Sequence, residues 1–179
     1  MQEGTMVMEE SASAARAVVL GPGEGTPVWF LGNLMVLKAT TQSTNGGYGL
    51  LESLIRPGAS PPLHVHHRED ETFWVLEGEV TIRCGDEIFH APAGSYVFLP
   101  RGVPHTFRVE GETPARMLTL LTPGGGEMFF VEGGRPAEQP TLPPPGRPDL
   151  AHLERVAHAF GSEFVGPPLP PATGAPAEG

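Results

Sequence analysis

Short apolar runs alternate with turn-forming residues along most of this 179-residue chain. The runs are shorter than ordinary helices and are separated by Gly, Pro, Asn and Asp, so they predict β-strands. We expect strands at residues 17–20, 27–31, 34–38, 47–55, 63–66, 71–76, 80–84, 87–90, 95–99, 105–110 and 116–121. Many short strands joined by explicit turns predict an all-β sandwich or barrel.

One segment near the end of the chain has the periodicity of a helix. Asp149 is suited to cap the first turn, and Gly161 is suited to end the last one. Between them a single apolar face is formed by Leu150, Leu153, Val156, Ala157 and Phe160. We therefore predict a short helix at residues 149–160 that packs outside the barrel, and a shorter helical turn at residues 127–131.

The chain divides into four predicted segments. Residues 1–15 are polar or small and are expected to be flexible, and residues 16–125 are expected to form the barrel. A C-terminal extension at residues 126–165 contains the helix. Residues 166–179 form a tail rich in Pro and Ala, a composition typical of extended or disordered chain.

Charge and composition argue against several classes of function. The formal net charge is -10, which disfavours nucleic acid or an anionic membrane as a partner. No apolar run approaches the ~20 residues of a membrane span, and no basic segment precedes an apolar one as it does in a signal peptide. Cys84 is the only cysteine, so no internal disulfide can form. These features predict a cytoplasmic protein.

The most informative residues are three histidines and a glutamate on neighbouring predicted strands. Residues i and i+2 of a strand point to the same side, so His64 and His66 converge. Glu71 opens the next strand, and His105 opens a later one. If these sides face the interior, the four side chains surround one metal ion. Imidazole suits Zn, Cu, Fe and Ni, and the carboxylate keeps Mn, Fe and Co possible, so we expect one divalent transition metal per chain.

Strand alternation also predicts the walls of a substrate pocket beside the metal. Phe73 and Val75 share the side of Glu71, and two further apolar residues, Phe107 and Val109, share the side of His105. These side chains would line an apolar interior next to the ligands.

Polar and aromatic residues near the ligands are expected to have other roles. Alternation directs His67 away from the interior, and Glu69 and Asp70 are expected to form a solvated acidic loop. Trp74 lies on the side opposite Glu71 and is predicted to belong either to the core or to a dimer contact.

These residues resemble the two sequence motifs of the cupin superfamily. The first motif appears whole as Gly58, His64, His66, Glu71 and Gly78, and the second appears as Gly94, Pro100, Gly102 and His105. Val109 departs from the second motif, which has Asn at that position. The chain after residue 121 resembles small single-domain cupins that are similar to quercetin 2,3-dioxygenase.

The resemblance implies a cupin-type double-stranded β-helix, a jelly-roll barrel, in which His64, His66, Glu71 and His105 hold the metal. It also implies that Glu71 is the catalytic residue, which takes a proton from a flavonol hydroxyl. Apolar neighbours should raise the pKa of the Glu71 carboxyl and so suit it to act as a general base.

Three functions are compatible with such a site. The first is a metal-dependent dioxygenase acting on a small enolic or phenolic, flavonol-like substrate. The second is an isomerase, cyclase or decarboxylase that needs no O2, and the third is a non-catalytic module that binds a small molecule. Single cupins commonly form dimers, so we predict a homodimer, with the apolar run at residues 28–30 supplying the contact.

Overall fold

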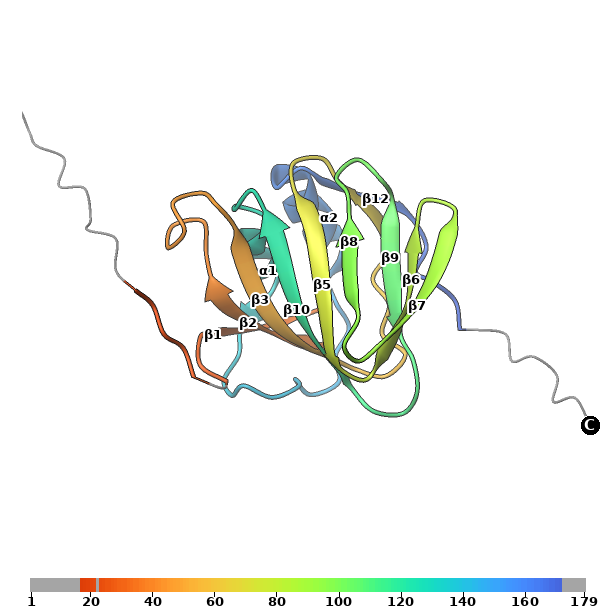
Figure 1. Cartoon of the computed structure of the whole chain (residues 1–179), viewed down its shortest axis with the longest axis horizontal. Helices are drawn as coiled ribbons and strands as arrows, with labels where there is room; N and C mark the ends of the chain where they lie inside the picture. Colours follow the sequence, from red (N-terminus) through yellow and green to blue (C-terminus); the bar gives the residue numbers. More distant parts are fainter. Residues whose placement is uncertain (1–16, 22, 172–179) are drawn as a thin grey trace, which may run out of the picture.

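The computed structural model describes residues 17–21 and 23–171, which fold into two antiparallel sheets and two helices. The predicted flexible segment at residues 1–15 lies outside the described residues, as do residues 172–179 of the predicted tail. Figure 1 shows that the two sheets together form one barrel-like body. The prediction of a mainly β architecture is therefore confirmed.

Each sheet is built from strands that are distant in sequence. The larger sheet has seven strands in the order β11 (Arg135–Pro136), β1 (Thr26–Phe30), β2 (Asn33–Ala39), β3 (Gly49–Ile55), β10 (Ala115–Thr122), β5 (Asp70–Glu77) and β8 (Tyr96–Leu99). The smaller sheet has five strands in the order β12 (Ser162–Gly166), β4 (Leu63–His66), β9 (His105–Val109), β6 (Glu79–Cys84) and β7 (Glu87–Pro92).

The core lies between the sheets because their strands present apolar residues to one side. Every second residue of β3 and of β10 is buried, which is the period expected of strands with one face in the core. Leu51 and Leu121 of the larger sheet join Val80 and Ile82 of the smaller sheet in one apolar cluster, and all four are 0% exposed. Each such side chain stabilises the fold by roughly 1.5–3 kcal/mol.

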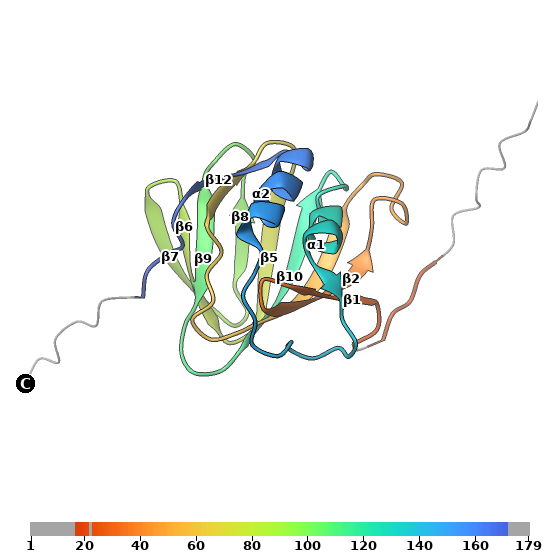
Figure 2. The same cartoon turned by 180° about the vertical axis from the view of Figure 1, so that it is seen from behind.

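Two short helices cover one side of the barrel. Figure 2 shows α1 (Glu127–Gly133) and α2 (Leu150–Ala159) side by side, in front of strands of the larger sheet. Asp149 caps α2, as predicted, by accepting a hydrogen bond from the backbone N–H of His152. Leu153 and Ala157 are buried in the main apolar cluster, so α2 lies outside the strands and closes the barrel. Within the described residues no helix is long and apolar enough to cross a membrane.

Most of the predicted strands match strands of the structure to within two residues at each end. The prediction for residues 17–20 is wrong, because this segment pairs with no strand, and Val18 and Val19 are exposed. The sequence pattern does not reveal β11 or β12. β11 has only two residues, and β12 begins directly after the Gly161 that follows α2.

The apolar run at residues 28–30 is not free to form a dimer contact, so that part of the dimer prediction is wrong. Val28, Trp29 and Phe30 are buried in their own chain. β1 pairs on both sides, with β2 and with β11. Arg135 of β11 also lies over the Trp29 ring, 4.7 Å from its centroid. A two-residue strand is enough to cover this edge of the sheet.

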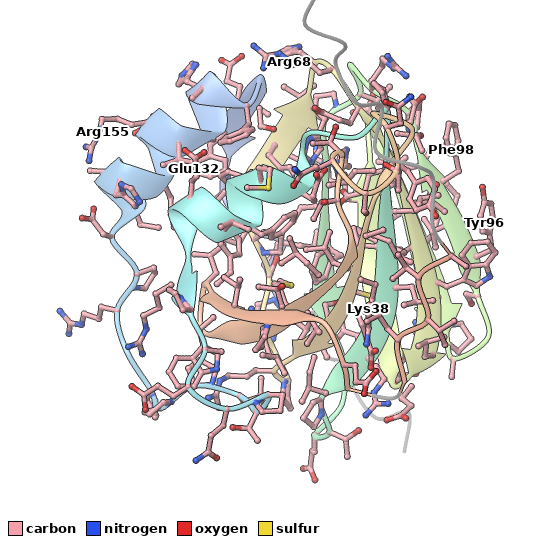
Figure 3. The ribbon with its side chains drawn as sticks, turned by 90° about the vertical axis from the view of Figure 1, so that its left-hand side faces the viewer. Lys38, Arg68, Tyr96, Phe98, Glu132 and Arg155 are labelled. Carbon is pink, nitrogen blue, oxygen red and sulfur yellow. The ribbon has the colours of Figure 1, made fainter. Side chains whose placement is uncertain are left out.

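Apolar side chains gather instead on the outer side of β5 and β8. Trp74 is 45% exposed and contacts Tyr96 edge to face, with 4.9 Å between the ring centroids. Figure 3 shows Tyr96 and Phe98 pointing away from the barrel. Of the two roles predicted for Trp74, the core is therefore wrong, and the dimer contact stays a prediction.

Candidate metal centre

Three strands bring four potential metal ligands together between the sheets. β4 carries His64 and His66, β9 begins at His105, and both strands belong to the smaller sheet. His64 and His105 lie opposite each other in the antiparallel pair of β4 and β9. Glu71 comes from β5 of the larger sheet, so the cluster joins the two halves of the barrel.

A turn at Gly102 sets the position of His105 relative to His64 and His66. Gly102 has a φ of 78°, in the left-handed region that disfavours residues with a Cβ. Its backbone N–H donates to the carbonyl of His66 at 2.8 Å. This bond ties the turn before His105 to the end of β4, which gives a physical reason for a glycine at this place in the motif.

The four side chains converge closely enough to share one ion. Candidate ligand atoms of His64, His66, Glu71 and His105 all lie within 4.8 Å of one another. Nε2 of His105 is 3.1 Å from Oε2 of Glu71, and Nε2 of His66 is 3.8 Å from the same oxygen. The structure thus brings together the same four residues that the sequence singles out.

Hydrogen bonds on the outer side of two rings direct their Nε2 atoms to the centre. Nδ1 of His64 bonds the Pro62 carbonyl at 2.8 Å, and Nδ1 of His105 bonds the Val103 carbonyl at 3.0 Å. A carbonyl only accepts hydrogen bonds, so Nδ1 carries the proton in both rings. In a neutral ring Nε2 then has the lone pair that a metal ligand needs; Nε2 of His105 must first lose the proton that it donates to Glu71.

The histidines have pKa values that differ because their surroundings differ. Burial, together with the neighbouring His105 and His66, lowers the pKa of His64 to about 4. Burial also lowers the pKa of His66, although the charge of Glu71 opposes it. For His105, burial works to lower the pKa, but the hydrogen bond to Glu71 outweighs it and the net pKa is raised. His64 and His66 are therefore neutral at neutral pH, which is the form that binds metal.

The pKa of Glu71 is lowered to about 2, so the prediction that it is raised is wrong. Burial does work to raise it, as the apolar walls suggest. The hydrogen bond from His105 and the charges of the three histidines outweigh this effect. Glu71 is only 4% exposed, yet it is ionised at neutral pH and can attract a cation.

An apolar cavity of about 380 Å³ opens beside these residues, with His64, His66 and Glu71 in its wall. The aromatic side chains of the wall are Phe30, Phe73, Phe107, Phe129, Phe130 and Phe164. They come from both sheets and from α1, so the C-terminal extension closes one side of the cavity.

The structure separates the four predicted pocket residues into two groups. Phe73 and Phe107 line the cavity and contact each other edge to face, with 5.6 Å between the ring centroids. Val75 and Val109 are each 1% exposed, and they belong to the core behind the wall. Alternation correctly places all four inside the barrel, but it does not tell which of them reach the cavity.

Residues that adjoin the ligands in sequence lie outside the cluster. His67 is exposed, as alternation predicts. Asp70 is partly exposed and bonds the Arg101 guanidinium through both oxygens, at 3.1 and 2.7 Å. Glu69 is only 4% exposed, so its prediction as a solvated residue is wrong. The bend at residues 67–68 returns its side chain to a place behind His66, with Oε2 4.0 Å from Nδ1 of that ring.

Two residues of the site come from β12, which the sequence pattern does not reveal. Ser162 lies opposite His66 in the pair of β4 and β12, and Phe164 lies opposite His64. Phe164 lines the cavity, and Oγ of Ser162 is 3.0 Å from Nδ1 of His66. The residues after Gly161 are Ser, Glu, Phe and Val, which do not alternate between polar and apolar, so the pattern indicates neither this strand nor its partner.

The donor set fits one divalent transition metal ion. Two rings have their Nε2 atoms directed at the centre, and the carboxylate is ionised within reach of them. Nitrogen donors with one carboxylate oxygen suit Mn, Fe, Co, Ni, Cu and Zn, and ligand type alone does not select among them.

Comparisons with known proteins agree with this arrangement. Residues 51–121 match the Cupin domain family, and this span contains all four candidate ligands. "Polyketide synthase CurC" of Streptomyces cyaneus is 27% identical over 135 residues, which are 75% of this chain and 73% of that protein. "Quercetin 2,3-dioxygenase" of Bacillus subtilis is 28% identical over 92 residues, which are 51% of this chain and 27% of that protein.

A solved structure is similar in fold. The crystal structure of a predicted oxalate decarboxylase from Thermotoga maritima has a TM-score of 0.53 and 23% identity, and the match covers 58% of this chain and 97% of that one. This likeness concerns the barrel and not the activity. The domain match and the two motifs show that residues 51–121 form a cupin domain.

Proposed function

We propose that this chain is a metal-dependent dioxygenase that acts on a small molecule with an acidic enol or phenol hydroxyl, such as a flavonol. The observation that carries the proposal is the cluster of His64, His66, Glu71 and His105 beside an apolar cavity of about 380 Å³. Pockets for small molecules commonly have volumes of about 300–1,000 Å³, so the cavity suits a ligand of a few rings.

The wall of the cavity favours an uncharged aromatic ligand. Of the described residues that line it, none is Lys or Arg, and Glu71 is the only carboxylate. The hydroxyls of Ser53 and Ser60 donate to carbonyls of the protein itself. A sugar phosphate would need basic or numerous polar partners, whereas phenylalanine rings offer the apolar surface that an aromatic ring buries.

Glu71 receives the hydroxyl proton of the substrate in this proposal. Its carboxylate is ionised at neutral pH and lies inside the ring of three histidines, with Oε2 3.1 Å from Nε2 of His105. A carboxylate whose pKa is about 2 is a weak base, so the substrate hydroxyl must become more acidic. A bound metal ion supplies this acidity by acting as a Lewis acid on the substrate oxygen. Phe73 and Phe107 exclude water from the carboxylate, and both atoms of O2 enter the product.

The relatives support this chemistry and one alternative. The similarity to quercetin 2,3-dioxygenase supports a flavonol-like substrate, although it covers only 27% of that protein. The similarity to "Polyketide synthase CurC" spans most of both chains and supports a polyketide-like substrate, which suits the alternative of an isomerase, cyclase or decarboxylase that needs no O2. The same ligands and the same base would serve both reactions, since each begins with removal of a proton from an acidic position.

Incubation with and without O2 tests the proposal. The chain is loaded separately with Fe, Mn, Ni, Co, Cu or Zn and mixed with a flavonol, a diketone or a catechol. We expect O2 consumption with at least one combination and incorporation of both labelled oxygen atoms from ¹⁸O2. Loss of activity in His66→Ala, with activity retained in the matched control His67→Ala, would connect the reaction to the cluster.

Each other outcome points to a different function. If no combination of metal and substrate leads to O2 consumption, the proposal of a dioxygenase is refuted. Product formation under strict anaerobiosis would support the isomerase, cyclase or decarboxylase. Tight binding of a ligand that stays unchanged after long incubation would support a binding module.

We also expect a cytoplasmic homodimer whose partner is a small molecule and not nucleic acid or a membrane. The net charge of -10 supports the exclusion of anionic partners. The exposed Trp74, Tyr96 and Phe98 on the outer side of the larger sheet support a contact between copies there.

A further inference from the structure

The C-terminal extension contacts the cluster of candidate metal ligands through the hydroxyl group of Ser162. β12 follows α2 and pairs with β4, the strand that carries His64 and His66. Ser162 lies directly opposite His66, and its Oγ is 3.0 Å from Nδ1 of that ring. Ser162 is 4% exposed, so bulk water does not compete for this contact. It also lies outside the residues 51–121 that match the Cupin domain family.

His66 differs from the other two histidines in what holds its ring. His64 and His105 each donate from Nδ1 to a carbonyl two residues earlier in the chain. Those bonds are local and form wherever the segment adopts this backbone. In the part of the chain that the structure describes, the hydrogen-bond partner of Nδ1 of His66 is a side chain 96 positions away.

We infer that Ser162 is a positioning residue that holds the His66 ring with Nε2 directed at the metal. A ring that binds metal through Nε2 carries its proton on Nδ1 and can only donate from that atom. The Ser162 oxygen then accepts a hydrogen bond from the Nδ1–H group. Partners of this kind fix the tautomer and the orientation of metal-bound histidines. The inference rests on the proposed metal site but not on the reaction that follows.

Glu69 supports the same tautomer from a second direction. Its Oε2 lies 4.0 Å from Nδ1 of His66, and the residue is 4% exposed. Among the described residues this oxygen has no hydrogen-bond partner. A carboxyl oxygen placed here attracts an N–H and disfavours a lone pair, so it favours the proton on Nδ1 over the proton on Nε2.

Removal of the Ser162 hydroxyl tests the inference. Ser162→Ala removes the acceptor and leaves the four ligands in place. We expect the Co(II) affinity, measured by competition with a chelator, to fall by about 10- to 100-fold. The visible absorption of bound Co(II), which reports the coordination geometry, should change as well. Glu163→Ala is the matched control: it changes the adjacent residue of β12, which contacts the exposed His67, and should leave both readouts unchanged.

Two further measurements test the inference even if Ser162→Ala fails to fold. Ser162→Thr keeps the hydroxyl and should recover most of the affinity that alanine loses. In the unaltered chain loaded with Zn(II), long-range ¹H–¹⁵N NMR correlations should show His66 protonated at Nδ1 and bound through Nε2. Coordination of His66 through Nδ1 would overturn the inference.

The results separate this inference from the proposed function. Equal Co(II) affinity and spectra for Ser162→Ala and the unaltered chain would overturn the role of Ser162 alone. Co(II) binding without O2 consumption would count only against the dioxygenase. A chain that binds neither Co(II) nor Zn(II) would overturn both.

Discussion

Acidification should release the metal in steps, in an order that follows from the position of each ligand. The ligands bind as neutral imidazole and ionised carboxylate, so every proton taken up by the free site competes with the metal. His105 takes up a proton first, because its pKa is raised above the ordinary value of 6.5. His66 and His64 take up protons at lower pH because their pKa values are lowered, His64 at about pH 4, and Glu71 stays ionised down to about pH 2.

The quantity to predict is the slope of log metal affinity against pH, because release in steps has no single midpoint. Once His105 is protonated in the free site, each fall of one pH unit lowers the affinity by about tenfold, or about 1.4 kcal/mol. The slope of log affinity against pH should be about one just below neutral pH. It should rise toward about three as the pH falls past the lowered pKa values of His66 and His64, of which that of His64 is about 4.

Equilibrium dialysis of the Co(II)-loaded chain, with metal analysis at fixed ionic strength between about pH 7.5 and 3.5, measures this slope. His90→Ala should give the same curve, since the His90 side chain is 57% exposed and lies on β7, outside the cluster. Full retention of metal at about pH 4 would refute the histidine ligands. A slope of about three already near neutral pH would refute the separation of the pKa values by burial and by Glu71.

Three further predictions test other parts of the structure. Val109→Asn should lower the free energy of unfolding by about 3 kcal/mol in urea denaturation, because it places an amide where a 1% exposed valine packs in the core. Unchanged stability would show that the asparagine of the family motif fits here. Phe164→Ala should raise the KM for an aromatic substrate roughly tenfold by removing a ring from the cavity wall, with Co(II) affinity retained; an unchanged KM would place the substrate elsewhere. Trp74→Glu should convert the predicted dimer into a monomer in light-scattering measurements, because it puts a charge on the exposed apolar face; a dimer that persists would have its contact on another surface.

Much of the barrel and the identity of the clustered residues follow from local features of the sequence. The period of two in segments such as β3 and β10 depends only on which side of a strand faces the core. The motif glycines Gly58, Gly78, Gly94 and Gly102 all have positive φ, a requirement that a single residue satisfies by itself. Alternation likewise places His64 and His66 on one side of β4, and Glu71 and Phe73 on one side of β5.

What local features cannot decide is which distant segments meet. The two-residue strand β11 covers the edge of β1, and this pairing turns the run at residues 28–30 from an exposed contact into core. Glu69 is buried because a bend returns it to His66, although its own sequence neighbours are polar.

By itself, the sequence determined the strands, the helix with its Asp149 cap and the four residues of the cluster, since each depends on spacing within a short segment. Only the tertiary structure decided the surroundings of that cluster. It placed Ser162 behind His66, and it reversed the expected pKa shift of Glu71 by surrounding the carboxylate with three imidazoles. A pKa or a ring orientation is the sum of interactions from groups far apart in the chain, and these groups become neighbours only when the sheets pack.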